Sequence, residues 1–319
     1  QYHSVVIPLR NYLKDYGVHF DLGHEVVDID FNLSADKKTA SVIHLKDKNE
    51  IVLGANDYVF ITNGSITEST DNGAWERPAK LKGIAESGSW QLWKTLAKKD
   101  KAFGNPNPFC DHIDLQKWYS FTATLKDSTF HDYMENFSGN VDGTGGLVTM
   151  TDSNWLMSIV IARQPHFPNQ PEDVKIFWGY GLYPDRKGNH VNKTMAECTG
   201  REILEELWYH LNVQDLMNPV VHAGKVNCIP TAMPYIDSLF MPRKIGDRPK
   251  VLPKGATNFA FLGQFAEVPK DVVFTVEYSV RTAQTAVFGL FETDKKVLPV
   301  YDSIHSPKAL LTAVKSISG

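Results

Sequence analysis

Residues 58–65 decide the fold class, and they read Tyr58-Val59-Phe60-Ile61-Thr62-Asn63-Gly64-Ser65. A compact apolar run that ends in a short polar turn is typical of a buried parallel strand. Residues 258–265 repeat the arrangement, because a second strand-like run ends at Gly263-Gln264-Phe265. The sequence therefore predicts an α/β fold with two such strands, each running into a small turn.

Each turn is a candidate contact for a nucleotide. In open α/β sheets, nucleotides lie in the crevice beyond the carboxyl ends of the strands. Glycine in such a turn lets the backbone approach a phosphate or a ring closely. Taken alone, each turn is a weak indication, because a strand followed by glycine occurs in any α/β protein.

A long helix is predicted over residues 271–290, only a few residues after the second turn. Its first turn, residues 272–275, would direct backbone N–H groups toward the same crevice. The small residues Ser279, Ala283 and Ala286 would allow close packing. A core helix packed on the sheet is the alternative, and both can hold at once. One helix face is expected to carry Val276, Val280, Ala283, Val287 and Leu290.

The remaining pattern predicts a second domain threaded into the first. A helix from Val5 to Tyr16 precedes a small meander over residues 25–53, and another helix starts near Ser89. Residues 118–125, 147–150, 155–162 and 174–180 are expected to form a mixed or antiparallel sheet. Thr199 and Glu202 form a capping box ahead of a helix whose apolar face carries Ile203, Leu204, Leu207, Trp208 and Leu211.

Five prolines between residues 230 and 253 predict that this stretch is an ordered but irregular crossing, without regular helix or strand. Residues 310–314 are predicted to form a final short helix. The predicted domains are residues 1–65, part of a nucleotide-binding domain with the meander; residues 66–255, the inserted second domain; and residues 256–319, which return to the first domain with the closing strand and the long helix.

Composition sets several bounds on function. The chain has 319 residues, a formal charge of -4 and no basic patch, so nucleic acid is not an expected partner. Its three cysteines lie far apart, which argues against a disulfide framework or a zinc site and favours a reducing compartment such as the cytoplasm. No run of eighteen apolar residues predicts a membrane span. The 17 Phe, 12 Tyr and 7 Trp fit a large core or an apolar ligand cavity.

Several common motifs are absent from the sequence. No G-x-G-x-x-G opens a helix after a strand, and no G-x-S-x-G, P-loop or H-E-x-x-H occurs. A dinucleotide site without its phosphate loop would be half a site. Because the chain starts at Gln1 without an initiator Met and enters a helix directly, we expect a domain cut or a processed product.

Twelve segments together resemble the oleate hydratases, once called myosin-cross-reactive antigens. The resemblance covers nearly the whole chain but not the family's N-terminal part. The segments are residues 1–2, 61–69, 103–106, 151–158, 163–167, 178–185, 195–200, 233–236, 241–243, 246–249, 261–265 and 274–281.

The resemblance implies the fold of amine-oxidase-like flavoproteins, in which an FAD-binding Rossmann-type domain is interleaved with a substrate domain. It implies a hydro-lyase that adds water across a cis double bond of an unsaturated long-chain fatty acid, typically oleate to 10-hydroxystearate. FAD would undergo no net redox change. The family's acid/base pair, a Glu and a Tyr, lies before the position that matches Gln1, so no catalytic residue is assigned here. A homodimer and a peripheral membrane contact are further expectations.

The resemblance also implies a partial set of binding residues. Val26 or Val27 would lie beside the adenine, and Gly263-Gln264 stands where many flavoproteins have Gly-Asp. Glutamine removes that charge yet still offers donors and an acceptor. Gln1 resembles a glutamine near the fatty acid carboxylate. The expected FAD contacts are Val26, Val27, Thr62, Asn63, Gly64, Ser65, Gly263, Gln264, Phe274 and Thr275, and no metal is expected.

Two other readings stay open at this level. One is a redox flavoprotein of the amine oxidase or carotenoid isomerase type. The other is a non-catalytic homologue that only binds fatty acids, although such a protein has no need of the two glycine turns. For a hydratase, the missing phosphate loop and acid/base pair predict weak or no activity of these residues alone.

Overall fold

The computed structural model describes residues 2–144, 146–271, 275–303 and 305–318. It has a mixed α/β fold that divides into two compact units, and these units interleave along the sequence. The first unit consists of Gln1–Glu25, Ser65–Gln91 and Pro108–Met241. The second consists of Val26–Gly64, Leu92–Asn107 and Pro242–Gly319.

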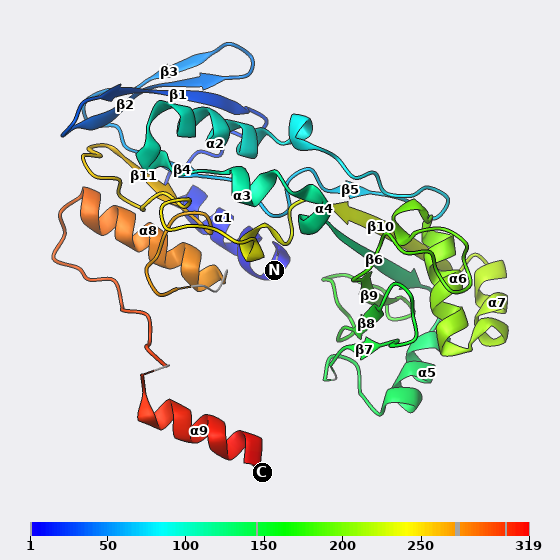
Figure 1. Cartoon of the computed structure of the whole chain (residues 1–319). Coiled ribbons are helices and arrows are strands. Elements are labelled where there is room, and N and C mark those ends of the chain that lie inside the picture. Colours follow the sequence, from blue (N-terminus) through cyan, green and yellow to red (C-terminus); the bar gives the residue numbers. More distant parts are fainter. Residues whose placement is uncertain (1, 145, 272–274, 304, 319) are drawn as a thin grey trace. The chain divides into compact units, whose positions relative to one another are not determined.

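Within its described residues, the first unit contains a six-stranded antiparallel sheet in the order β5-β10-β6-β9-β8-β7 (Figure 1). The predicted antiparallel sheet is therefore confirmed. The strands are β5 (Asp71–Asn72), β6 (Trp118–Leu125), β7 (Val148–Thr149), β8 (Met157–Ile161), β9 (Lys175–Gly181) and β10 (Val226–Met233).

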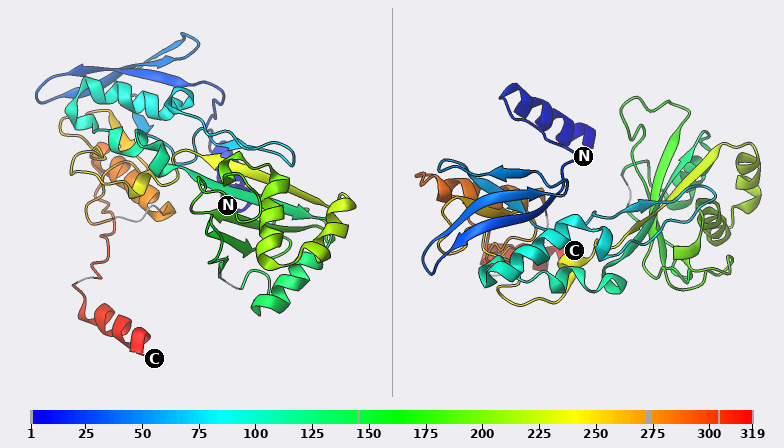
Figure 2. Two further views of the ribbon diagram at one scale, coloured as in Figure 1. Left: turned by 45° about the vertical axis from the view of Figure 1, so that its right-hand side comes forward. Right: turned by 90° about the horizontal axis from the view of Figure 1, so that it is seen from above.

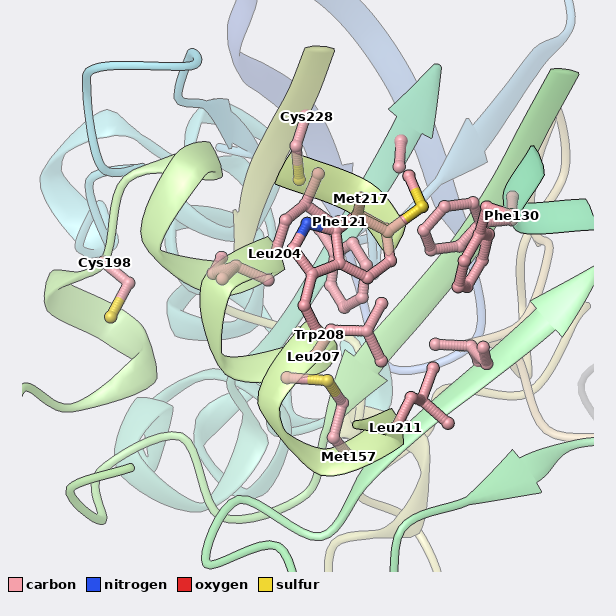
Figure 3. Packing of buried hydrophobic residues seen from close by; sticks show 14 of the residues in the cluster. Phe121, Phe130, Met157, Cys198, Leu204, Leu207, Trp208, Leu211, Met217 and Cys228 are labelled. Carbon is pink, nitrogen blue, oxygen red and sulfur yellow. The ribbon is translucent and has the colours of Figure 1, made fainter. Parts of the chain in front are cut away.

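Three helices cover one face of this sheet (Figure 1, Figure 2), namely α5 (Thr129–Ser138), α6 (Gly200–Leu211) and α7 (Gln214–His222). The predicted apolar face of α6 is confirmed, because all five of its residues are buried in the core that Figure 3 shows. Phe121 on β6 lies where a Cβ on Gly179 of β9 would come within 2.4 Å of its ring, so glycine leaves room for it. The other helices of this unit are α1 (Ile7–Asp15), α3 (Asn107–Cys110) and α4 (Ile113–Gln116).

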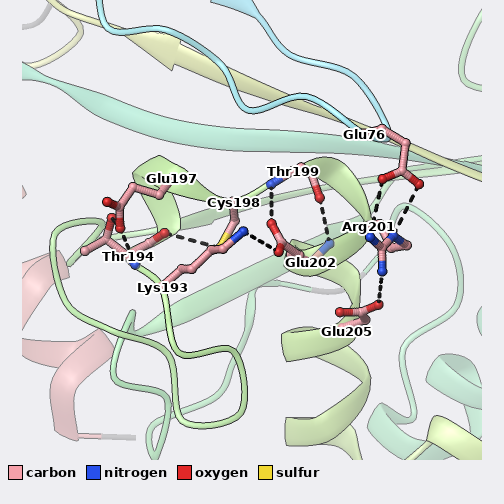
Figure 4. Close-up of polar contacts among 9 residues, drawn as sticks. All are labelled: Glu76, Lys193, Thr194, Glu197, Cys198, Thr199, Arg201, Glu202 and Glu205. Carbon is pink, nitrogen blue, oxygen red and sulfur yellow. Dashed lines mark hydrogen bonds and ion pairs between the residues drawn. The ribbon is translucent and has the colours of Figure 1, made fainter.

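The start of α6 is fixed by the predicted capping box (Figure 4). The hydroxyl of Thr199 accepts a hydrogen bond from the Glu202 amide at 3.3 Å, and the Thr199 amide donates to the Glu202 carboxylate at 3.0 Å. Lys193 pairs with the same carboxylate at 2.6 Å. A Cβ on Gly200 would lie 2.0 Å from the Cys228 carbonyl oxygen, so glycine lets the helix begin against β10.

The predicted irregular crossing is wrong at its beginning, because Pro230 lies inside strand β10. The Pro230 carbonyl accepts a hydrogen bond from Gly73 at 2.7 Å, just beyond the end of the short strand β5. In a strand, the N–H and C=O of one residue point to the same side. The missing N–H of Pro230 therefore faces the side where β5 has ended, and the ladder with β6 continues.

In the described part of the second unit, two small sheets flank a core of aromatic and branched side chains. The antiparallel sheet consists of β1 (Val26–Leu33), β2 (Lys38–Leu45) and β3 (Glu50–Val52), which confirms the predicted meander. The parallel pair consists of β4 (Val59–Thr62) and β11 (Phe259–Leu262). β4 is less buried than expected, because it buries Val59 and Ile61 but exposes Phe60.

Three helices complete the description. Helix α2 (Gly88–Lys99) begins in the first unit and continues into the second, and its residues Trp90, Trp93 and Leu96 are fully buried. Helix α8 (Val276–Leu290) packs against β11. Helix α9 (Pro307–Ser318) confirms the predicted final helix and extends it. Among the described residues, no helix is both long and apolar enough to cross a membrane.

His44 joins all three strands of the antiparallel sheet and gives it a pH dependence. One ring nitrogen lies 2.8 Å from the Asp30 carboxylate on β1, and the other 3.1 Å from the Glu50 carboxylate on β3. The hydrogen bond to Asp30 is the main cause that raises the pKa of His44. A histidine with a raised folded pKa stabilises the fold below its unfolded pKa of about 6.5 and loses this contribution as the pH rises through the folded pKa.

We therefore expect His44→Gln to destabilise the chain most near about pH 5.5 and less near about pH 8.5. Urea unfolding of both proteins across this range measures the difference. If the difference in free energy of unfolding between the two proteins stays constant with pH, the stabilisation does not come from the protonated His44 ring.

Candidate functional site

The two predicted turns lie next to each other. Strands β4 and β11 are parallel, and Leu262 pairs with Thr62 at their carboxyl ends. Asn63-Gly64 and Gly263-Gln264 therefore leave the sheet from the same edge, which is the edge where α/β proteins bind nucleotides. Both glycines need their residue type, because φ is +62° at Gly64 and +82° at Gly263. A Cβ on Gly263 would also come within 3.1 Å of the Thr62 methyl group.

The side chain of Asn63, in the first of these turns, is buried and has no hydrogen-bond partner in the part of the chain that the structure describes. Only 2% of its surface is exposed, and neither its amide nitrogen nor its amide oxygen is bonded to any described residue. Asn258, just before β11, is also buried, but its amide bonds both backbone groups of Ala40 and the Asp57 carbonyl. Buried polar groups are nearly always paired. The Asn63 amide therefore marks a place for a polar ligand or a bound water.

Helix α8 packs against the second turn with a different face from the one predicted. Its buried residues are Tyr278, Thr282 and Ala286, whereas Val276 is 62% exposed and Val280 is 48% exposed. The predicted face was wrong at Val276, Val280 and Val287, because it ranked positions by hydrophobicity and the contacting face carries two hydroxyl groups. Ala286, predicted to allow close packing, is buried in the core, and Leu290 packs against it. Thr275 is the N-cap and accepts a hydrogen bond from the Tyr278 amide at 3.4 Å, so the described helix begins later than expected.

The other predicted contacts are distributed more widely. Val26 and Val27 begin β1, in the separate antiparallel sheet, and Val27 is 37% exposed. Ser65 is the first residue of Ser65–Gln91, a segment of the first unit. Its carbonyl accepts a hydrogen bond from the Trp90 indole at 3.2 Å. Gln1 and Phe274 lie outside the described residues.

The residues that follow Gln1 line a hollow in the first unit. Its volume is about 690 Å³, and its walls are Tyr2, His3, Ser4 and residues 165–168. His3 and Phe167 meet edge to face with 6.5 Å between their ring centroids. In the described residues, no group of three or more His, Cys, Asp or Glu side chains could hold a metal ion.

Sequence reasoning missed two rows of side chains on the first unit's sheet, on the face opposite its core. One row takes one polar residue from every strand. At one end of this row Thr231 donates a hydrogen bond to Asn72 at 3.0 Å, and at the other end the hydroxyls of Thr149 and Ser158 lie 2.8 Å apart. By strand register, this polar row is Asn72, Thr231, Ser120, Tyr180, Ser158 and Thr149. The neighbouring row is mostly apolar and consists of Ile229, Thr122, Trp178 and Val160.

The apolar row is partly open, because Trp178 and Ile229 are each 38% exposed. Trp178 also contacts Tyr180, with 5.2 Å between ring centroids, and Tyr180 contacts Trp118 at 4.8 Å. Trp178 is thus the aromatic side chain of this row that stays partly exposed, whereas Tyr180 beside it is buried. The alternation of residues along each strand is visible in the sequence. The two rows are not, because they depend on how the strands pair.

Comparison with known proteins identifies a family and two relatives. The chain is 43% identical over 325 residues to the oleate hydratase of Streptococcus pyogenes serotype M49 (strain NZ131), an alignment that covers 98% of this chain and 55% of that protein. It is 33% identical over 343 residues to the linoleate hydratase of Lactiplantibacillus plantarum, covering 99% of this chain and 60% of that protein. The chain thus spans little more than half the length of these relatives. The profile of the MCRA family matches residues 1–288, and the chain belongs to that family.

Proposed function

We propose that this chain is part of a fatty acid hydratase, a hydro-lyase that adds water across a cis double bond of an unsaturated long-chain fatty acid. The observation that carries the proposal is the pair of adjacent glycine turns with the buried Asn63 amide, in a chain 43% identical to an oleate hydratase. Both relatives are named for unsaturated fatty acids, which supports oleate or a similar acid as substrate.

FAD is the proposed cofactor, and the residues of the second unit fit it. The glycines at positions 64 and 263 keep the strand ends open to close approach, and Asn63 offers an unused donor and acceptor. Thr62, Gln264 and Thr275 complete the proposed contacts. Gln264 is half-buried, so its amide can meet a polar group of the cofactor at the edge of the sheet. Bound FAD would organise the site without net redox change.

The fatty acid is proposed to lie along the apolar row of the first unit's sheet, where Trp178 and Ile229 are partly exposed. The apolar row crosses four strands, which at about 4.8 Å per strand spacing gives about 14 Å of apolar surface. Thr231 and Thr149, toward the ends of the polar row, are proposed to supply hydroxyl groups for water or for the hydroxylated product, whereas Ser120, Tyr180 and Ser158 are buried. The proposed contact of Gln1 with the carboxylate rests on the family resemblance, since Gln1 lies outside the described residues. A homodimer and a peripheral membrane contact rest on the family resemblance alone.

These 319 residues alone are expected to hydrate oleate weakly or not at all, because the sequence contains no G-x-G-x-x-G. A hybrid that joins the unmatched part of the streptococcal relative to this chain should restore conversion of oleate to 10-hydroxystearate. Gas chromatography of the products measures this, and flavin fluorescence measures FAD binding in both proteins.

Three outcomes would count against parts of this proposal. Robust conversion by the 319 residues alone would contradict the expected weakness. Bleaching of bound flavin during turnover of an amine or a polyene would favour a redox flavoprotein. Saturable fatty acid binding by the hybrid, without flavin absorbance and without product, would favour a non-catalytic fatty acid binder.

A further inference from the structure

The loop that follows β11 is held by a buried tyrosine on the first turn of α8. Tyr278 is 1% exposed, and its hydroxyl makes three hydrogen bonds. It donates to the Ala266 carbonyl at 2.6 Å and accepts from the Val268 amide at 3.1 Å. It also accepts from the Arg248 guanidinium at 3.1 Å. One phenol group therefore closes the far end of the loop of residues 263–268.

A second hydroxyl holds the near end of the same loop. Thr282 lies one helical turn after Tyr278, so both side chains project from the same face of α8. The Thr282 hydroxyl is fully buried, accepts from the Gly263 amide at 3.0 Å and donates to the Ser279 carbonyl at 2.7 Å. Thr282 therefore takes the Gly263 amide and ties the start of the loop to the helix.

Arg248 connects this pair to the rest of the second unit. It is 5% exposed, and its guanidinium carbon lies 5.7 Å from the centre of the Tyr278 ring. Its neighbour Asp247 accepts from the Asn105 side chain at 3.1 Å, and the Asp247 carbonyl accepts from the Asn105 amide at 2.8 Å. Two of the segments that carry the family resemblance, residues 103–106 and 246–249, are therefore hydrogen-bonded to each other, and the second of them contacts Tyr278 through Arg248.

The outer side of the loop is fixed as well. The Glu267 amide donates to the Pro249 carbonyl at 2.7 Å, and the Glu267 carboxylate pairs with Arg243 at 2.9 Å. Burial is the largest cause that raises the pKa of Tyr278, so its hydroxyl stays protonated and can donate to Ala266 at any physiological pH.

We propose that Tyr278 and Thr282 are positioning residues that set the conformation of residues 263–268 before the cofactor binds, with Arg248 orienting Tyr278. The proposal rests on the proposed FAD site at Gly263-Gln264. Their hydroxyls act through the loop and touch no cofactor themselves. Such preorganisation lowers the entropic cost of binding.

The test compares Tyr278→Phe and Thr282→Val with the wild-type chain. Phenylalanine keeps the buried ring, and valine keeps the branched shape, so each variant removes mainly the hydroxyl. Each variant removes the acceptor of one loop amide, that of Val268 in Tyr278→Phe and that of Gly263 in Thr282→Val. We expect amide hydrogen exchange in residues 263–268 to become about tenfold faster in each variant, the effect of losing about one buried hydrogen bond per amide. Thr282→Ser retains the hydroxyl and should restore slow exchange. Where FAD binds, its affinity should fall with the loss of protection.

Tyr133→Phe is the matched control, because that hydroxyl donates to the Leu211 carbonyl at 3.0 Å in the first unit. It should leave exchange in residues 263–268 unchanged. Unchanged exchange in both test variants, or equally faster exchange throughout the chain, would overturn the positioning role. If the wild-type loop is protected but neither the chain nor its hybrid binds FAD, the proposed function fails instead.

Discussion

Asn63→Leu is expected to stabilise the chain and to weaken FAD binding at the same time. The Asn63 amide is buried, and neither of its polar atoms has a hydrogen-bond partner among the described residues. Leaving such a group unpaired costs about 1–3 kcal/mol, and leucine has a similar size without the polar atoms. We expect the free energy of unfolding to rise by about 1 kcal/mol, while the dissociation constant for FAD rises about tenfold or more.

Asn258→Leu provides the matched control in the same unit. Its amide makes three hydrogen bonds that join β2 to the segments before β4 and β11. The same change there should lower the free energy of unfolding by about 2–4 kcal/mol, because it leaves buried backbone groups unpaired. Urea unfolding and flavin fluorescence measure both variants. An Asn63→Leu variant that is destabilised as much as Asn258→Leu would mean that Asn63 is satisfied in the free protein and is not reserved for a ligand.

Local patterns in the sequence predicted the elements whose signal lies within a few consecutive residues. The apolar runs of β4 and β11 and the Thr199–Glu202 capping box are of this kind, because a strand or a helix start depends on near neighbours. The turn at Gly263 was also predictable, since glycine followed a strand. These elements correctly placed the two glycine turns at the carboxyl ends of two parallel strands.

Features that depend on pairing between distant segments were not predictable. Pro230 suggested a break, but its missing donor faces the side where β5 ends, which only the strand order reveals. The polar row joins Asn72 to Thr231 across 159 positions of sequence. On α8, polar Tyr278 and Thr282 are buried because the loop after β11 offers them partners, while hydrophobic Val276 is exposed. Tertiary hydrogen bonds there outweigh the hydrophobic pattern that guided the prediction.

Glu206→Gln is expected to cause a large loss of stability in the first unit. Glu206 lies on α6 and is fully buried. Its carboxylate accepts hydrogen bonds from the amides of Asn189 at 2.6 Å, His190 at 3.0 Å and Val191 at 2.7 Å. The His210 ring lies 3.1 Å away on the next helical turn. The carboxylate thus anchors the loop before α6 to the core of the first unit.

Glutamine has the same shape but replaces one acceptor oxygen by a donor. The new NH₂ group would face backbone N–H groups that are also donors. Because two donors cannot bond to each other, both groups would stay buried without a partner. Removing one member of a buried charged network costs about 3–5 kcal/mol, and we expect a loss of about 3 kcal/mol here because most of the contacts remain. Limited proteolysis should then cut within residues 186–194, which the intact carboxylate holds in place.

Glu205→Gln is the control, since it changes the same residue type one position away. The Glu205 side chain is 42% exposed and pairs with Arg201 at 3.1 Å, so its loss should change the free energy of unfolding by no more than about 0.5 kcal/mol. Urea unfolding of the two variants at one pH separates the buried role from the exposed one. Equal stability of both variants would show that the buried hydrogen bonds of Glu206 only replace those it makes to water in the unfolded chain, and that the loop is held by its other contacts.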